Sequence, residues 1–258
     1  MNTGYFDEAV VYLFEPDFTK LTAAGVLTAM GQAFFSLSLG MGAIMIYGSY
    51  LPHGASITRT TVMVAINDTF VAVVAGLAIF PIVFANGLKP ELGAGMVFKV
   101  LPIAFGKMPG GEFFGTLFFI LLVFAAWTSS ISLLEPMVTW LVENKGMNRV
   151  KAAAWSGLGA WVLGVFCLLS LNIGSSYKIF GKSFIDLVEF LAANIMLPLG
   201  GFLIAIFVGW VMAKDSTLDE LGLGDHMGFR IWRFLVRYIA PLAVAVVLLN
   251  ATGIIELG

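Results

Sequence analysis

Six apolar stretches, each long enough to cross a lipid bilayer, constrain the fold of this chain more than any other feature of its sequence. They run over residues 22–50, 60–85, 113–141, 152–171, 184–212 and 229–249. A helix needs about 20 largely apolar residues to span the hydrocarbon core. The chain is 59% hydrophobic and 12% charged, whereas soluble domains carry about twice that share of charge. The sequence therefore predicts an all-α, multi-pass membrane protein with about six transmembrane helices.

The first stretch contains an unusual segment, FFSLSLGMG at residues 34–42, in which two serines and two glycines interrupt apolar sequence. Backbone that leaves the helical hydrogen-bond pattern is tolerated at membrane depth only where protein or a water-filled cavity satisfies it. Secondary transporters use such breaks to present free amides, carbonyls and helix ends to substrates and ions. We therefore expect the first spanning helix to be broken in mid-membrane, between Ser36 and Gly40.

The remaining segments predict the topology. We expect residues 1–21 to form an extracellular loop and residues 22–258 a single transmembrane domain. Residues 86–112 contain an apolar run, Met96 to Phe105, that is too short to span, which predicts a re-entrant or capping segment.

Basic residues are unequally divided between the two sets of loops. One set holds Arg59, Lys145, Arg149, Lys151, Lys214, Arg230, Arg233 and Arg237, close to the ends of the spans. The other set holds Lys20, Lys89, Lys99, Lys107, Lys178 and Lys182. The positive-inside rule places the denser set in the cytoplasm, and both termini of the chain outside it.

Polar groups within the apolar stretches are the candidates for chemistry. The amide oxygen of Asn67 suits a hard cation, although an asparagine serves equally well as a hydrogen-bonding link between helices. Thr128 and Ser129 share one sector of a helix with Ser132, where their oxygens suit a dehydrated sodium ion, with tight packing of small residues as the alternative. Asp186 is either half of a salt-bridged gate or a solvated helix end.

Several function classes are excluded or disfavoured. No H-E-x-x-H, G-x-S-x-G or P-loop pattern occurs, and His53 and His226 lie in polar loops. A net charge of −2 offers no basic surface for nucleic acid. The single cysteine, Cys167, excludes an internal disulfide. We expect neither an enzyme nor a nucleic-acid partner.

Motifs along the chain resemble successive parts of the neurotransmitter:sodium symporter family. QAFFSLSLGMG (32–42), followed by YGSYLP, resembles the sixth transmembrane segment, and NDTFVAVVAGLAIFP (67–81) the seventh. GMVFKVLPIAFGKMPGG (95–111) resembles the fourth extracellular loop, AAWTSSISLLEPMV (125–138) the eighth segment and VRYIAPLAV (236–244) the eleventh. The resemblance covers nearly the whole chain. It implies segments six to eleven of a bacterial leucine-transporter-like protein, which is half of that inverted-repeat fold plus one helix, without the first five segments.

The resemblance implies a sodium-coupled symporter of amino acids or related small amines in the plasma (inner) membrane. The residues that would line the substrate site are Phe35, Ser36, Ser38, Met41, Ser129 and Leu133. The residues that would bind sodium ions are Ser36 and Asn67 at a first site, and the Ala125 carbonyl with the Thr128 and Ser129 hydroxyls at a second.

The resemblance also implies an anion position and a gate. Gln32, Ser36 and Asn67 would border the position of a chloride ion or a balancing carboxylate. Val71 replaces the serine or acid that relatives carry there, so chloride dependence stays open. Asp186 would be the outer-gate acid, whose arginine partner lies on the family's first segment.

Three interpretations of the chain follow. It is the C-terminal portion of a symporter that contributes half of each site, and it needs the missing N-terminal transmembrane segments as a partner. Alternatively, it is a half-size transporter that works only as a dimer, or a non-transporting membrane remnant.

Overall fold

The computed structural model describes residues 5–52, 54–90, 95–222, 224 and 226–255. His53, which the sequence placed in a polar loop, lies outside the described residues. The described residues form helices joined by turns, and five of the helices are long and apolar enough to cross a membrane. These five are Ile57–Ala85, Gly111–Lys145, Arg149–Leu171, Phe184–Val211 and Met227–Ala251. The all-α, multi-pass architecture is therefore confirmed.

The chain divides into two compact units, and each is described by itself. Unit 1 comprises residues 1–20 and 63–130, and unit 2 comprises residues 21–62 and 131–258. Two long helices, α4 (Ile57–Ala85) and α6 (Gly111–Lys145), contribute residues to both units.

Unit 1 is organised around the end of α4. Its other elements are α1 (Tyr5–Phe14), the 3₁₀ turn η1 (Phe18–Lys20), the π-helical segment η2 (Met96–Val100), α5 (Leu101–Lys107) and the first part of α6. Val83 of α4 is fully buried against Val100, Leu101 and Phe105. The apolar run that was too short to span thus forms a short helical segment packed on α4, while its position in the membrane stays a prediction.

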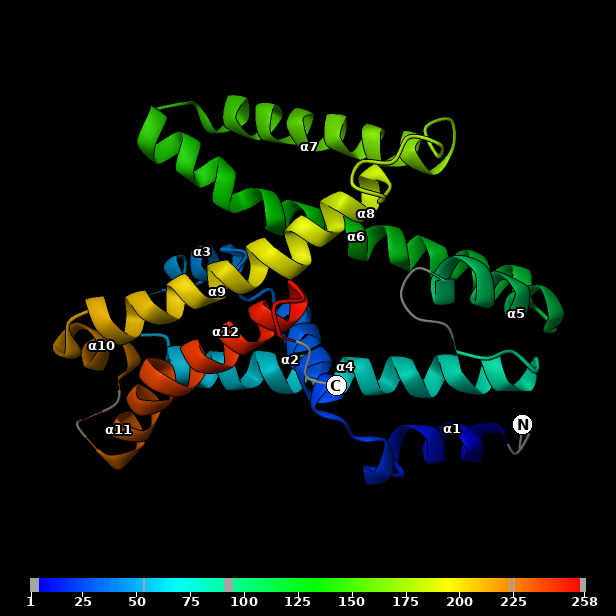
Figure 1. The fold of residues 1–258 in the computed structure, drawn as a ribbon, viewed down its shortest axis with the longest axis horizontal. Coiled ribbons are helices and arrows are strands. Elements are labelled where there is room, and N and C mark those ends of the chain that lie inside the picture. Colours follow the sequence, from blue (N-terminus) through cyan, green and yellow to red (C-terminus); the bar gives the residue numbers. More distant parts are fainter. Residues whose placement is uncertain (1–4, 53, 91–94, 223, 225, 256–258) are drawn as a thin grey trace. The chain divides into compact units, whose positions relative to one another are not determined.

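Helix α1 lies along α4 in unit 1 (Figure 1). The ring of Tyr12 meets Phe80 and Phe84 edge-on, with centroids 5.0 and 5.6 Å apart. The sequence led us to expect a loop over this segment, and the structure corrects that expectation for residues 5–14. Its apolar residues find a partner surface only in the folded unit, which a local pattern does not reveal. The extracellular position of residues 1–21 stays a prediction.

Unit 2 holds most of the membrane-length helices. Its elements are α2 (Ala23–Ser36), α3 (Ala43–Ser49), the start of α4, the end of α6, α7 (Arg149–Leu171), α8 (Phe184–Glu189), η3 (Phe190–Met196), α9 (Leu197–Ile206), η4 (Phe207–Val211), α10 (Lys214–Leu221), α11 (Met227–Phe234), η5 (Leu235–Ile239) and α12 (Ala240–Ala251). The segments α8 to η4 form one continuous helix with two π-helical stretches, and α11 to α12 form another with one.

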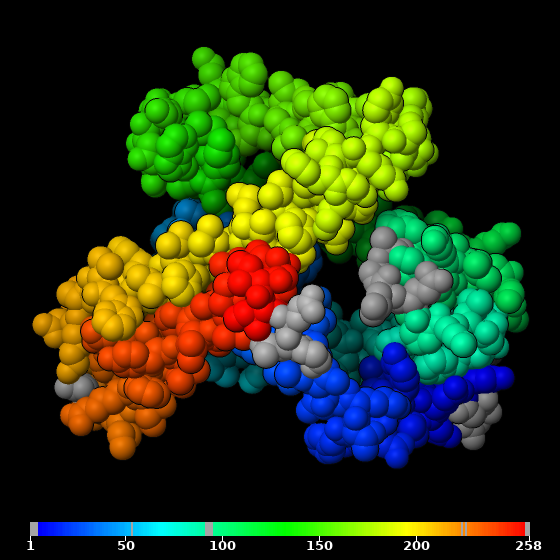
Figure 2. Space-filling view, viewed as in Figure 1, coloured from blue at the N-terminus to red at the C-terminus, as the bar shows by residue number. Residues whose placement is uncertain are grey.

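Helices α9 and α12 pack side by side, with α2 against both (Figures 1 and 2). Leu197 and Ala205 of α9 and Val244 and Val247 of α12 are buried there. Most large apolar side chains elsewhere on these helices are exposed, as lipid-facing residues of a membrane protein would be. This three-helix core holds the break that follows α2.

Candidate functional site

The predicted break in the first helix is present. Helix α2 ends at Ser36 and α3 begins at Ala43. Ser38, Gly40 and Gly42 between them have positive φ angles of 53°, 79° and 82°. The last bonds of the first half are Leu37 N–H to Ala33 O and Leu39 N–H to Phe34 O, at 3.1 and 2.9 Å.

The break leaves a row of backbone donors. Among the described residues, the amides of residues 40–45 donate to no backbone carbonyl, and the pattern resumes with Ile46 N–H to Gly42 O at 3.0 Å. Amides at the start of a helix carry the positive end of its dipole. An array of this kind suits a carboxylate or another anionic group.

Close backbone packing against α9 holds the break in place. A side-chain carbon on Gly40 would overlap the carbonyl oxygen of Leu197 and lie 2.8 Å from the amide nitrogen of Gly201. A side-chain carbon on Gly200 would in turn overlap the carbonyl oxygen of Gly40. Only glycine permits this approach, and Gly40 also needs its left-handed conformation. The Pro-Leu-Gly-Gly run at 198–201 therefore supports the break through this close backbone contact.

A polar network anchors the second half of the broken helix to α6. The Tyr50 hydroxyl donates to Glu135 Oε1 at 2.7 Å, and Tyr47 donates to Ser132. Arg149, at the start of α7, forms an ion pair with the same Glu135 oxygen. The Glu135 side chain is only 12% exposed, so its charge is largely withdrawn from water and depends on these partners.

Most of the predicted residues of unit 2 lie in the break or on the last turns of α2. Gln32, Phe35 and Ser36 lie exposed on the last turns of α2, and Ser38 and Met41 lie half-buried within the break. Leu133 is exposed on α6. These side chains are accessible to a ligand, as the predicted roles require.

Asp186 is placed elsewhere in unit 2. Its carboxylate accepts a hydrogen bond from the Ser183 backbone at 3.3 Å, and the Ser183 hydroxyl accepts from the Asp186 amide, which makes a capping box at the start of α8. This is the helix-end role that the sequence left open as the alternative. The gate role stays a prediction.

The predicted sodium ligands of unit 1 lie on exposed faces of α4 and α6. On α6, the Thr128 hydroxyl donates to the carbonyls of Phe124 and Ala125 at 3.1 and 3.0 Å. A hydroxyl and a carbonyl oxygen from Thr128 and Ala125 thus converge on one turn, beside the exposed Ser129. Asn67 is exposed on α4. Within the described residues no three His, Cys, Asp or Glu side chains are grouped as a metal site, so the candidate donors are neutral oxygens, which suit a hard cation.

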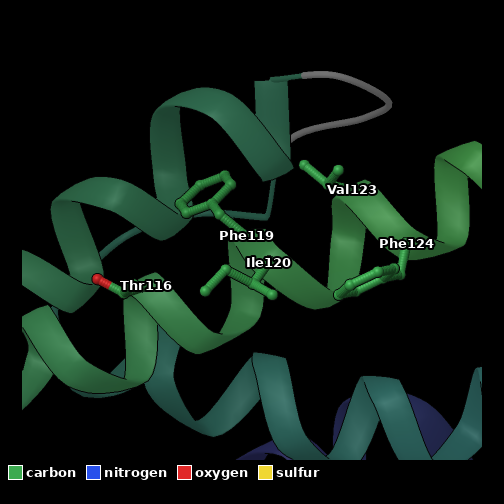
Figure 3. Close-up of a pocket in the computed structure, with 5 residues that line it drawn as sticks. All are labelled: Thr116, Phe119, Ile120, Val123 and Phe124. Carbon is green, nitrogen blue, oxygen red and sulfur yellow. The ribbon is translucent and has the colours of Figure 1, made fainter.

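An apolar cavity of about 520 Å³ lies along α6 in unit 1 (Figure 3). Its lining residues are Thr116, Phe119, Ile120, Val123 and Phe124. All of them come from one helix, and none belongs to the predicted site. Its last lining residue, Phe124, directly precedes Ala125 in the sequence.

Sequence reasoning missed the role of Glu135 and the glycine contact that supports the break. A carboxylate within an apolar span was visible, and such a group requires a partner. Arg149 follows it closely enough in sequence to have been a candidate. The approach of Gly40 to Gly200 carried no comparable signal, because the two glycines are far apart in the chain.

The broken helix and the membrane-length helices define a multi-pass, all-α membrane protein. A family model described as the sodium:neurotransmitter symporter family matches residues 3–256. The chain therefore belongs to the sodium:neurotransmitter symporter family, as its motifs indicated.

Similar proteins support this assignment. An uncharacterized sodium-dependent transporter of Bacillus subtilis is 38% identical over 96% of this chain and 56% of its own length. Another, from Haemophilus influenzae, is 36% identical over 94% of this chain and 53% of its own length. The crystal structure of MhsT in complex with L-phenylalanine matches with a TM-score of 0.84 and 41% identity, covering 95% of this chain and 56% of that one. The chain thus spans about half the length of the relatives it matches. These relatives are transporters rather than enzymes.

Proposed function

We propose that this chain is the C-terminal portion of a sodium-coupled symporter of amino acids or related small amines, and that it contributes half of the substrate and sodium sites. The observation that carries the proposal is the break between α2 and α3, where the amides of residues 40–45 donate to no backbone carbonyl among the described residues. The amides would bind the substrate carboxylate. Phe35, Ser36, Ser38, Met41, Ser129 and Leu133 would line the remainder of this half of the site.

Similar proteins support an amino-acid substrate. MhsT was crystallised with L-phenylalanine, and a relative from Drosophila melanogaster, 24% identical over 96% of this chain and 40% of its own length, is named a sodium-dependent nutrient amino acid transporter. The flexible thioether of Met41 would adapt the pocket to apolar side chains of different shape.

Sodium ions would bind at two places. Ser36 and Asn67 would contribute oxygens to one, and the Ala125 carbonyl with Thr128 and Ser129 to the other. Gln32, Ser36 and Asn67 would border the anion position, where the apolar Val71 supplies no charge of its own. Transport measured with chloride replaced by gluconate would show whether a chloride ion takes that position.

The setting would be the plasma membrane, with both termini of this chain outside the cytoplasm. Asp186 would serve as the outer-gate acid once the family's first segment brings its arginine. The N-terminal transmembrane segments of the family, on the same or another polypeptide, would complete each site.

Complementation tests this proposal. The chain is purified alone, and also after co-expression with the part of the Bacillus subtilis relative that precedes the matched region. Binding of radiolabelled L-phenylalanine is measured with sodium and with potassium. We expect saturable, sodium-dependent binding only for the pair. Saturable binding by the chain alone would instead support a half-size transporter, and no binding by either preparation would support a non-transporting remnant.

A further inference from the structure

Two π-helical segments of unit 2 meet, one at the end of a membrane-length helix and the other within the next membrane-length helix. Segment η4 closes the helix that spans Phe184–Val211, and η5 lies in the middle of the helix that spans Met227–Ala251. Wide turns of this kind are rare and occur often at functional sites. Here they bring Trp210 of η4 against Arg237 of η5.

The contact between the two segments is close and specific. A side-chain carbon on Gly209 would lie 2.9 Å from the Cα of Arg237, so the backbones approach closely there. The indole N–H of Trp210 donates to the carbonyl oxygen of Arg237 at 3.1 Å. The guanidinium of Arg237 lies 4.2 Å from the centre of the Trp210 ring and 5.7 Å from that of Tyr238. The guanidinium of Arg237 thus lies against two aromatic rings.

Two arginines at this place carry buried donors without an acceptor. Arg237 Nε and Arg233 Nη1 are both buried and make no hydrogen bond, and neither arginine forms an ion pair within the part of the chain that the structure describes. A buried cationic donor without a partner is costly, so the pair calls for an anion. Planar guanidinium groups match the oxygens of a phosphate group particularly well.

The surroundings indicate where that phosphate comes from. The apolar side chains around the two arginines are between 46% and 67% exposed, and they are Trp210, Val211, Ile231, Phe234, Leu235 and Tyr238. In a membrane protein such a surface contacts acyl chains. Trp210 lies at the end of its helix, and Trp and Tyr are enriched at the level of lipid headgroups. The expected orientation puts this end at the cytoplasmic leaflet, where anionic lipids and juxtamembrane basic residues meet.

From these observations we propose that Arg233 and Arg237, framed by Trp210 and Tyr238, form a binding site for the phosphate of an anionic phospholipid. The site does not depend on the substrate or sodium sites, so it is tested separately from transport.

The test compares two lipids with identical acyl chains. The purified chain is titrated with dioleoyl phosphatidylglycerol or dioleoyl phosphatidylcholine, and bound lipid is measured by native mass spectrometry. We expect preferential binding of phosphatidylglycerol. The double variant Arg233→Gln/Arg237→Gln is expected to weaken that binding by roughly 30-fold, since each interfacial basic residue contributes to the affinity for anionic lipid. Binding of phosphatidylcholine should be unchanged.

A matched control variant removes two positive charges at positions outside the proposed site. Arg59 and Lys151 are exposed and lie in the same predicted set of loops, so Arg59→Gln/Lys151→Gln is expected to retain the preference. An equal loss in both double variants would reduce the effect to bulk charge and overturn the proposal. Displacement of the lipid by inorganic phosphate would overturn it as well, because the site would then be a simple anion site.

A second variant covers the case in which the double variant does not fold. Arg237→Lys keeps the positive charge and removes the planar guanidinium group. We expect this variant to bind phosphatidylglycerol several-fold more weakly. Its circular dichroism spectrum should be unchanged. Wild-type affinity in this variant would contradict recognition by the guanidinium of Arg237.

Discussion

Gly40 satisfies two requirements at once, a left-handed backbone and direct contact with α9. We expect Gly40→Ala to destabilise the chain by about 2–4 kcal/mol, because it adds conformational strain to a clash with the Leu197 carbonyl. Thermal unfolding in detergent, followed by circular dichroism, measures this change. Substrate binding by the complemented chain should be lost at the same time, since the break would move.

The control for Gly40 is Gly157 in α7. Nothing lies within 4 Å of a side-chain carbon built there. Gly157→Ala should stabilise the helix slightly, by about 0.5–1 kcal/mol, because alanine has the higher helix propensity. If both variants unfolded at the same temperature, the close contact of Gly40 with α9 would not stabilise the break.

Thr128 offers a second test at the scale of one residue. Thr128→Val keeps the shape of the side chain and removes the oxygen beside the Ala125 carbonyl. We expect the complemented chain to need at least tenfold more sodium for half-maximal substrate binding, because a charged ligand's oxygen contact is worth about 1.5–3 kcal/mol.

The matched control for Thr128 is Thr116→Val on the same helix. Thr116 makes the equivalent bond to the carbonyl of Glu112, at 2.7 Å, and lies outside the predicted site. Sodium dependence should be unchanged in this variant. Equal effects of both substitutions would indicate a change in the helix rather than the loss of a sodium ligand.

At the scale of elements, Glu135 joins α3, α6 and α7 through Tyr50 and Arg149. Arg149→Ala would leave the Glu135 carboxylate without its counter-charge, and we expect a lower unfolding temperature. Adding Glu135→Gln should reverse much of this decrease, because the amide still accepts from Tyr50 and carries no charge. Thermal unfolding of the single and double variants measures the coupling. Additive losses would show that the ion pair does not link the three helices.

Features that depend on residues close together in the sequence were predictable, whereas features that depend on contacts between distant segments were not. The five membrane-length helices and the broken first segment followed from local sequence, because apolar length and a Ser/Gly-rich interruption act within one segment. Helix α1 did not, because its order depends on Tyr12 meeting Phe80 and Phe84. The same applies to the site. The residues beside the break came from motifs, whereas the Glu135 network and the Gly200 contact required the packed helices.

At the scale of the whole molecule, the predicted orientation can be tested by labelling. In a Cys167→Ser background, Tyr177→Cys places a thiol at an exposed position expected outside the cell, and Asp219→Cys places one on α10, expected inside. An impermeant maleimide should label the first variant in intact cells and the second only after permeabilisation. The reverse pattern would invert the topology.

The contact between Gly40 and Gly200 also predicts how homologous sequences vary at these two positions. Where two backbones touch with no side chain between them, neither position is free to change alone. An insertion or deletion among the six residues that link α2 to α3 would shift Gly40 away from its contact with α9. Across a set of homologous sequences, we therefore expect a bulkier residue at one of these two positions to coincide with a compensating change at the other, and insertions to avoid this linker.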